Sequence, residues 1–233
     1  MRGGRLKDGH NNMKQLRRLW HCSVATRTKK VVKNATLVAG KLHIELRNKI
    51  FPEATDRSLP RLYRELHAKT MFAGVTWKNS YELFAASIPN LEQQIILDFG
   101  CGPRGGIAEF LGDQRVISYD PYVQAYSTPP WNRRFDVLFS SDVLEHLSIA
   151  AIKQFTDNVL ACRPKYIFLN ISTRSADKTF AKGTNVHLTV KPTRWWQKKL
   201  NGYWGQNYSC VVLRDGRDEC TLLFQRLNAD QLS

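Results

Sequence analysis

The sequence predicts an α/β fold in which strands and helices alternate around a mostly parallel sheet. Short apolar runs recur through the second half of the chain, and segments with helical periodicity separate most of them. The end of the chain differs, because two apolar runs flank the turn-forming pair Asp215-Gly216. These observations predict a mostly parallel sheet that ends in an antiparallel C-terminal hairpin.

The expected elements follow one another in a regular order. They are helices at 58–67 and 79–88, strand 95–99, helix 106–111, strand 116–119, strand 137–140, helix 148–162, strand 166–171, helix 193–200, and strands 208–213 and 220–224. Only 14 residues separate Asp120 from Phe135. Because a full helix and strand need more chain than this, we expect the third strand and its helix to be reduced.

The N-terminal part of the chain is strongly basic. Residues 1–64 hold 16 of the 35 Lys and Arg residues but only 4 of the 20 Asp and Glu residues, so +12 of the net charge of +15 lies there. We expect residues 1–57 to form a basic extension, partly helical or disordered, and residues 58–233 to form the folded domain. Residues 1–64 can attract the phosphates of nucleic acid or anionic lipids, be simply solvated, or act as a transit peptide.

The five cysteines are scattered and form no Cys-x-x-Cys pair. This pattern is typical of free thiols in a reducing compartment. No apolar run approaches the roughly 20 residues that a membrane helix needs. The sequence therefore predicts a cytoplasmic protein without a transmembrane segment.

A glycine-rich turn directly follows the first predicted strand. Residues 95–106 read Ile-Ile-Leu-Asp-Phe-Gly-Cys-Gly-Pro-Arg-Gly-Gly, so the apolar run ends in Asp98. Such a turn brings backbone amides and a helix N-terminus close to a ligand. The next apolar run, 116–119, ends in Asp120, which is placed to accept hydrogen bonds from ribose hydroxyls. The two features together predict a site for a nucleoside-containing cofactor.

Two motifs resemble those of class I S-adenosylmethionine-dependent methyltransferases. Residues 97–102, Leu-Asp-Phe-Gly-Cys-Gly, resemble the family's first motif, and residues 135–147, Phe-Asp-Val-Leu-Phe-Ser-Ser-Asp-Val-Leu-Glu-His-Leu, resemble its fourth-strand motif. The resemblance covers residues 91–227 and implies a Rossmann-like fold with S-adenosylmethionine as cofactor. The cofactor contacts that it implies are Asp98, Gly100, Cys101, Gly102, Asp120, Pro121, Ser141 and Asp142.

The glycine loop departs from the family pattern at one position. The family's third glycine falls at Arg104, and Gly105 and Gly106 follow it. We therefore expect a loop that is one residue longer than usual.

A second set of polar residues is expected to act on the methyl acceptor. Asp142, Glu145 and His146 are spaced to lie on one face if their segment is helical, and His187 follows the next strand. Methyl transfer requires a nucleophile that is oriented and often deprotonated, so we expect catalytic roles for Glu145, His146 and His187.

The same four side chains, Asp142, Glu145, His146 and His187, also suit a divalent metal such as magnesium, manganese or zinc. Their spacing resembles that of metal-using O-methyltransferases that modify RNA 3′ ends or quinone precursors. Metal-free members of the class carry the same Asp-Val-Leu-Glu-His run, in which the acids cap a helix and line the cofactor pocket. A metal site and a metal-free pocket therefore both stay open.

Several aromatic residues are further candidates. Residues 187–196 resemble a segment of uncharacterised bacterial and phage methyltransferases. Within it, Trp195 and Trp196 either stack on a base or sugar or anchor a helix in the core, and the second interpretation is favoured. Candidates for the wall of the adenine or substrate pocket are Trp77, Tyr122, Tyr126 and Trp131.

The sequence thus predicts an S-adenosylmethionine-dependent methyltransferase directed at oxygen, with nitrogen as the alternative acceptor atom. The acceptor is a small molecule, a glycan or nucleic acid. One alternative is an RNA or DNA methyltransferase that uses the basic N-terminal arm. Another is a non-catalytic nucleic-acid-binding protein on the same fold. The Asn/Asp-Pro-Pro-Tyr motif of amino-methylating DNA enzymes is absent, and the intact Asp98 and Asp120 favour an enzyme.

Overall fold

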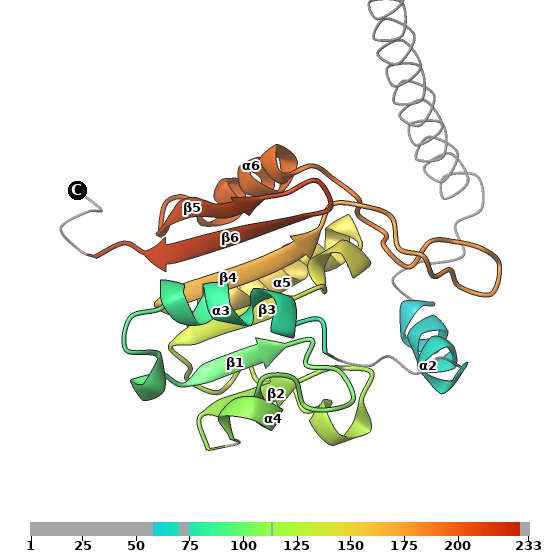
Figure 1. The fold of residues 1–233 in the computed structure, drawn as a ribbon, viewed down its shortest axis with the longest axis horizontal. Helices are drawn as coiled ribbons and strands as arrows, with labels where there is room; N and C mark the ends of the chain where they lie inside the picture. The colour runs from blue at the N-terminus through green and yellow to red at the C-terminus, as the bar shows by residue number, and fades with distance from the viewer. Residues whose placement is uncertain (1–57, 70–74, 113, 229–233) are drawn as a thin grey trace, which may run out of the picture. The chain divides into compact units, whose positions relative to one another are not determined.

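The computed structural model describes residues 58–69, 75–112 and 114–228 (Figure 1). The expected basic extension over residues 1–57 lies outside this part of the chain. Within it, no helix is both long and apolar enough to cross a membrane.

One sheet of six strands organises the fold, in the order β2-β1-β3-β4-β6-β5 (Figure 1). The strands are β1 (Ile96–Phe99), β2 (Val116–Tyr119), β3 (Val137–Ser141), β4 (Tyr166–Ser172), β5 (Tyr208–Asp215) and β6 (Glu219–Arg226). Strands β1 to β4 run parallel, whereas β6 is antiparallel to both β4 and β5. The predicted parallel sheet with an antiparallel C-terminal hairpin is confirmed.

The segment between β2 and β3 is short, as predicted. It holds a 3-10 turn, η2 (Gln124–Tyr126), and neither a strand nor an α-helix. Strand β2 is consequently the last strand on its side of the sheet.

Five α-helices and two further 3-10 turns are described. They are α2 (Leu59–Lys69), α3 (Lys78–Ser87), η1 (Leu91–Gln93), α4 (Ala108–Leu111), η3 (Leu144–His146), α5 (Ile149–Cys162) and α6 (Thr193–Trp204). Helix α4 is shorter than expected because Gly105 and Gly106 both take positive φ angles in the turn before it. Helix α6 continues past residue 200 because Leu200 and Trp204 extend its buried face.

Helices cover both faces of the sheet. Residues of α3 and α4, such as Phe84 and Ala108, pack with one set of strand side chains. Residues of α5 and α6, such as Phe155 and Trp196, pack with the other set. Neighbouring residues of β1 therefore enter opposite clusters, and parallel strands buried on both faces read as continuous apolar runs. Trp196 is fully buried, as the core interpretation predicts, and Trp195 is half-buried against this cluster.

A third, smaller cluster holds helix α2 against the chain. Leu59, Leu62 and Tyr63 of α2 pack against Phe180 and Val186, which belong to the long connection between β4 and α6. Val186 of this cluster directly precedes His187, one of the predicted catalytic residues.

Candidate functional site

The loop after β1 depends on glycine at two positions. The backbone amides of Gly100 and Cys101 donate to Tyr119 O, over 2.7 and 3.2 Å, which holds the loop against the end of β2. Gly100 and Gly106 have φ angles of 83° and 63°. A Cβ on Gly106 would lie 1.9 Å from Asp98 Oδ2. The loop therefore passes so close to Asp98 that a larger residue cannot take the place of Gly106.

Asp98 is a buried carboxyl at the end of β1. Its Oδ2 accepts a hydrogen bond of 2.9 Å from Ile107 N, at the start of the turn into α4. Burial raises its pKa to about 7, although the hydrogen bond from Ile107 opposes this shift, and the nearby Asp120 raises the pKa further. A cation bound beside Asp98 would favour the ionised form of this carboxyl, and the two opposite charges would then attract each other.

Asp120 joins the glycine loop to the segment after β2. Its Oδ2 accepts from Gly102 N over 3.1 Å, and its Oδ1 accepts from Tyr122 N over 2.9 Å. A carboxylate oxygen has a second lone-pair direction, so these bonds leave acceptor capacity for a ligand hydroxyl. Pro121 is exposed. Cys101 is buried and burial raises the pKa of its thiol, so the thiol stays protonated.

The end of β3 carries the other two predicted cofactor contacts. Ser141 Oγ accepts from Ser80 Oγ over 3.2 Å and from Asn170 Nδ2 over 3.4 Å. Asp142 takes a left-handed backbone conformation with a φ of 62°, and its amide donates to Asn170 O. The segment that follows forms the single 3-10 turn η3 and not an α-helix, so Asp142, Glu145 and His146 do not share a face of an α-helix.

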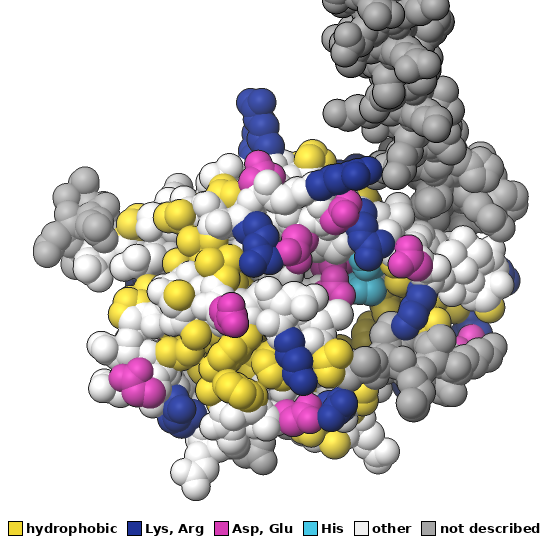
Figure 2. All heavy atoms as spheres, viewed as in Figure 1, with side chains coloured by type: hydrophobic (Ala, Val, Ile, Leu, Met, Phe, Trp, Pro, Cys, Tyr) yellow, Lys and Arg dark blue, Asp and Glu magenta, His cyan; other side chains and the backbone are white. Residues whose placement is uncertain are grey.

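The three predicted catalytic side chains nevertheless come together. Glu145, His146 and His187 each present a ligand atom, and these atoms lie within 4.8 Å of one another. The two imidazole rings are 4.6 Å apart, centroid to centroid, and nearly perpendicular. Asp142 lies outside this group but beside Glu145. Figure 2 shows a histidine side chain on the surface of this view, with acidic and basic side chains around it.

Glu145 is fully buried, and the described residues provide a hydrogen bond to only one of its two carboxyl oxygens. Its Oε1 accepts from Ser172 N over 2.9 Å, whereas its Oε2 has no hydrogen-bond partner among the described residues. Burial raises the pKa of Glu145 well above its usual value, and the neighbouring Asp142 raises it further. A buried, unpartnered carboxyl oxygen is costly for stability, so a ligand that contacts it would gain binding energy.

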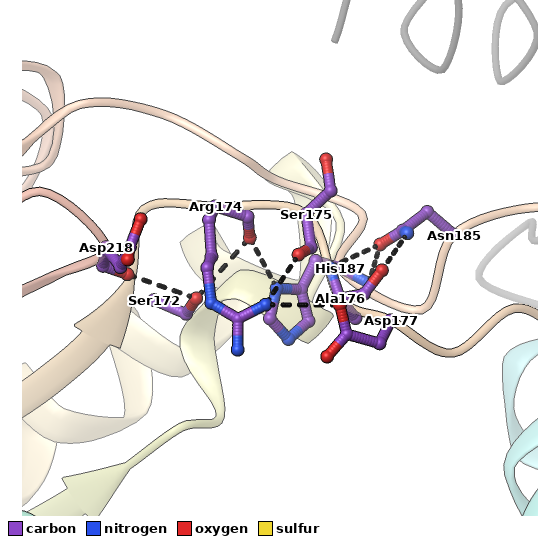
Figure 3. Close-up of polar contacts among 8 residues, drawn as sticks. All are labelled: Ser172, Arg174, Ser175, Ala176, Asp177, Asn185, His187 and Asp218. Atoms are coloured by element: carbon purple, nitrogen blue, oxygen red, sulfur yellow. Dashed lines mark hydrogen bonds and ion pairs between the residues drawn. The ribbon is translucent and has the colours of Figure 1, made fainter. Parts of the chain in front are cut away.

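His187 is held in one tautomer by a backbone carbonyl (Figure 3). Its Nδ1 lies 2.7 Å from Arg174 O. A carbonyl only accepts, so Nδ1 carries the hydrogen and Nε2 carries the lone pair. Burial lowers the pKa of His187, and the imidazole is therefore neutral near pH 7.

Asn185 anchors the loop that presents His187 (Figure 3). Its Oδ1 accepts from Ala176 N over 3.1 Å and from His187 N over 2.9 Å, and its Nδ2 donates to Ala176 O over 2.8 Å. One buried amide side chain thus ties two distant points of the loop together. The sequence offered a weak signal for this role, because Asn commonly binds the backbone two residues further on.

Tyr63 is a functional candidate that sequence reasoning did not identify. Its hydroxyl lies 3.0 Å from His146 Nδ1 and 3.2 Å from Val186 O. Its ring stacks on Tyr122, with centroids 4.8 Å apart. The contact with His146 spans 83 residues, and no sequence pattern signals it.

The other aromatic candidates divide between the core and the loop. Trp77 is buried in the cluster under α3, and Trp131 packs against the opposite cluster. Tyr126 lies against the glycine loop, where its hydroxyl would be 2.8 Å from a Cβ on Gly105. Tyr122 and Tyr126 are thus close to the predicted cofactor loop, whereas Trp77 and Trp131 stabilise the fold.

Comparison with known proteins identifies the fold. No family model and no curated protein sequence matches the chain. The structure is similar to the DhpI–SAH complex, at 15% identity and a TM-score of 0.51, with 73% of this chain and 96% of DhpI covered. It is also similar to Burkholderia thailandensis 1,6-didemethyltoxoflavin-N1-methyltransferase with bound 1,6-didemethyltoxoflavin and S-adenosylhomocysteine. That likeness has 14% identity and a TM-score of 0.50, and it covers 75% of this chain and 92% of the other. The protein has the class I S-adenosylmethionine-dependent methyltransferase fold.

Proposed function

We propose that the protein is an S-adenosylmethionine-dependent methyltransferase with the cofactor in the glycine loop and the acceptor at the Glu145–His146–His187 group. The observation that carries this proposal is the arrangement of Asp98 and Asp120 on either side of the loop. Both carboxyls stand at the carboxyl ends of parallel strands, where open α/β sheets bind their ligands.

The loop suits each part of the cofactor. The methionine carboxylate would meet backbone amides of residues 100–106, where bare amides favour an anion. The ammonium and sulfonium groups would lie near Asp98, whose buried carboxyl gains from a positive neighbour. Asp120 would accept hydrogen bonds from the ribose hydroxyls. The DhpI and Burkholderia structures contain S-adenosylhomocysteine, the product of this cofactor, which supports the same assignment here.

The acceptor group supports methylation of a hydroxyl. Methyl transfer from a sulfonium is an in-line displacement, and a hydroxyl must lose its proton as it attacks. His187 is neutral, and its Nε2 lone pair is the proton acceptor that its tautomer provides. We assign His187 and His146 the role of proton acceptors, and Glu145 the role of orienting the acceptor or a metal.

The same residues fit a divalent metal. Glu145 Oε2 is buried and has no hydrogen-bond partner in the described part of the chain, and His187 is oriented by a carbonyl on Nδ1, as metal-binding histidines are. One carboxylate and two imidazoles are typical ligands of zinc and of other first-row metals. Glu145, His146 and His187 would hold the ion, with Asp142 beside them. A metal there would lower the pKa of the acceptor hydroxyl.

An experiment with a radiolabelled methyl donor tests the proposal. The purified full-length chain is incubated with labelled S-adenosylmethionine and with separate RNA, glycan and small-metabolite fractions. We expect label to enter one fraction, and we expect His187→Ala to abolish the transfer. Chelation followed by metal analysis distinguishes the two modes, because full activity without bound metal would leave the histidines as proton acceptors. Transfer to no fraction by a chain that binds the cofactor would contradict a catalytic role.

A nucleic-acid acceptor is the second candidate, and the charge of residues 1–64 favours it. These residues carry +12 of the net +15. Binding through phosphates weakens steeply as salt rises, because counterions are released on binding. If RNA is the acceptor, its KM should rise with salt while the affinity for S-adenosylmethionine changes little. A salt-independent KM would exclude a role for the basic segment in acceptor binding.

A further inference from the structure

Tyr63 comes from a helix outside the alternating strands and helices, yet it reaches the acceptor group. Helix α2 packs through Leu59, Leu62 and Tyr63 on the small cluster that includes Val186. Tyr63 is buried, and burial raises the pKa of its hydroxyl well above the usual value. The hydroxyl is therefore a neutral group that both donates and accepts a hydrogen bond.

The hydroxyl oxygen of Tyr63, Nδ1 of His146 and the carbonyl oxygen of Val186 form a triangle of close contacts. Tyr63 Oη lies 3.0 Å from His146 Nδ1, Tyr63 Oη lies 3.2 Å from Val186 O, and His146 Nδ1 lies 3.1 Å from Val186 O. The two contacts of His146 Nδ1 have ordinary hydrogen-bond lengths, and the contact between Tyr63 Oη and Val186 O is a long hydrogen bond. His146 O lies farther from Tyr63 Oη, at 3.4 Å.

Only one placement of the hydrogens satisfies every side of the triangle. Val186 O is a carbonyl and can only accept, so His146 Nδ1 must carry a hydrogen to bond it. The Tyr63 hydroxyl then donates to Val186 O and accepts from His146 Nδ1. If Nδ1 were unprotonated, its lone pair would face the lone pairs of the carbonyl, which is repulsive.

We infer that Val186 O fixes His146 in the Nδ1–H tautomer and that Tyr63 is a positioning residue, whose hydroxyl bridges this carbonyl and Nδ1 and holds the ring against it, so that Nε2 carries the lone pair of this ring. His146 and His187 then have the same tautomer, because Arg174 O fixes His187 in the Nδ1–H form. The role of this tautomer in methyl transfer rests on the proposed function. There, the lone pair on Nε2 either accepts a proton or binds a metal.

The inference also gives helix α2 a role in the reaction. Tyr63 stacks on Tyr122, whose amide donates to Asp120. One side chain thus contacts both the loop of the predicted ribose-binding acid and the acceptor group. The acceptor site is complete only when α2 lies in place.

The tautomer can be observed directly, without any measurement of activity. Long-range proton–nitrogen correlation spectra of the uniformly ¹⁵N-labelled full-length chain at pH 8 separate the Nδ1–H and Nε2–H forms. The signals of His146 are identified by their loss in His146→Gln. We expect the wild-type ring in the Nδ1–H form and the Tyr63→Phe ring in a mixture of both forms. A wild-type ring in the Nε2–H form, or an unaltered spectrum in Tyr63→Phe, would overturn the inference.

A matched variant separates this effect from the loss of a buried phenol hydroxyl elsewhere. Tyr208 Oη donates to Pro164 O over 2.9 Å, and Tyr208→Phe makes the same chemical change far from the acceptor group. We expect Tyr63→Phe to lower kcat roughly tenfold with little change in the KM for S-adenosylmethionine, and Tyr208→Phe to leave kcat unaltered. Equal effects of the two variants would contradict a positioning role. A wild-type chain without transferase activity would refute the proposed function, while the spectra would still decide the tautomer.

Discussion

At the scale of single residues, the site contains buried carboxyl groups that accept fewer hydrogen bonds than their oxygens could. Asp98 accepts one hydrogen bond and has its pKa raised to about 7 by burial. Glu145 keeps one oxygen without a hydrogen-bond partner among the described residues. The protein would be more stable without such groups, so each of them points to a ligand that the site is built to receive.

Asp98 should make cofactor binding release protons near neutral pH. At pH 7 a carboxyl with a pKa of about 7 is half protonated, and a cation beside it lowers the pKa. We therefore expect release of roughly half a proton for each S-adenosylmethionine bound at pH 7, and less at pH 9. Titration calorimetry in buffers of different ionisation enthalpy measures this number. The release should disappear in Asp98→Asn, and its persistence there would assign it to another group.

The same shift fixes the pH dependence of stability, with a definite sign. A carboxyl whose pKa is raised on folding binds more protons in the folded state, so its contribution is present below pH 4 and is lost as pH rises to about 7. Through Asp98 the wild-type protein should lose up to about 4 kcal/mol of unfolding free energy over this pH range, and Asp98→Asn should not show this loss. Chemical unfolding of the cofactor-free protein at pH 4.5 and pH 8 provides the comparison. Parallel pH profiles of wild type and variant would contradict the assigned shift.

Glu145→Gln should separate stability from function. The substitution keeps an oxygen to accept from Ser172 N. It replaces the other acid oxygen, for which the described residues offer no hydrogen-bond partner, with an amide that can donate to the neighbouring Asp142. We expect the free energy of unfolding at pH 8 to rise by about 1 kcal/mol. Methyl transfer should fall roughly 100-fold or more, because an amide cannot supply the carboxylate oxygen that would orient a metal or the acceptor. A variant that is less stable but fully active would reverse this assignment.

At the scale of elements, the sequence predicted the strands well and the turns poorly. Strands β1 and β3 are buried on both faces, and this burial requires the apolar runs by which they were identified. The turn η3 was not predictable in this way. Its geometry depends on the left-handed Asp142 and on the bond from Asp142 N to Asn170 O, which joins two strands. The spacing from 142 to 146 left the backbone of this segment open, and the contact with β4 decides it.

The loop that carries His187 depends on one side chain, and this dependence is testable. Asn185→Ala removes three hydrogen bonds, two to Ala176 and one to His187 N. We expect the free energy of unfolding to fall by roughly 2–4 kcal/mol and kcat to fall at least tenfold. Asn185→Asp keeps both acceptor bonds and loses only the donor to Ala176 O, so it should lie between wild type and Asn185→Ala. An intermediate loss of stability without any loss of kcat would show that the loop need not be fixed for catalysis.

At the scale of the whole molecule, local sequence patterns explain the sheet and most of the site, whereas long-range contacts explain the position of Tyr63. The parallel strands with their antiparallel C-terminal hairpin, the reduced segment after β2 and the placement of Asp98 and Asp120 at one edge follow from the sequence pattern. The grouping of Glu145 and His146 with His187 follows from the same edge rule, since both segments leave the carboxyl ends of parallel strands. The place of Tyr63 did not follow, because α2 stands outside the alternation and meets His146 only through tertiary packing.

The central claim is that S-adenosylmethionine binds in the glycine loop, and calorimetric titration of the full-length chain with this compound tests it most directly. A matched pair of variants locates the site. A Cβ on Gly106 would clash with Asp98 at a positive φ, whereas a Cβ on Gly202 in helix α6 meets nothing within 4 Å. We expect one-to-one binding to wild type and to Gly202→Ala, and affinity at least tenfold weaker in Gly106→Ala and in Asp120→Ala. Absence of binding to the wild-type chain, or equal affinity in all four proteins, would contradict the account.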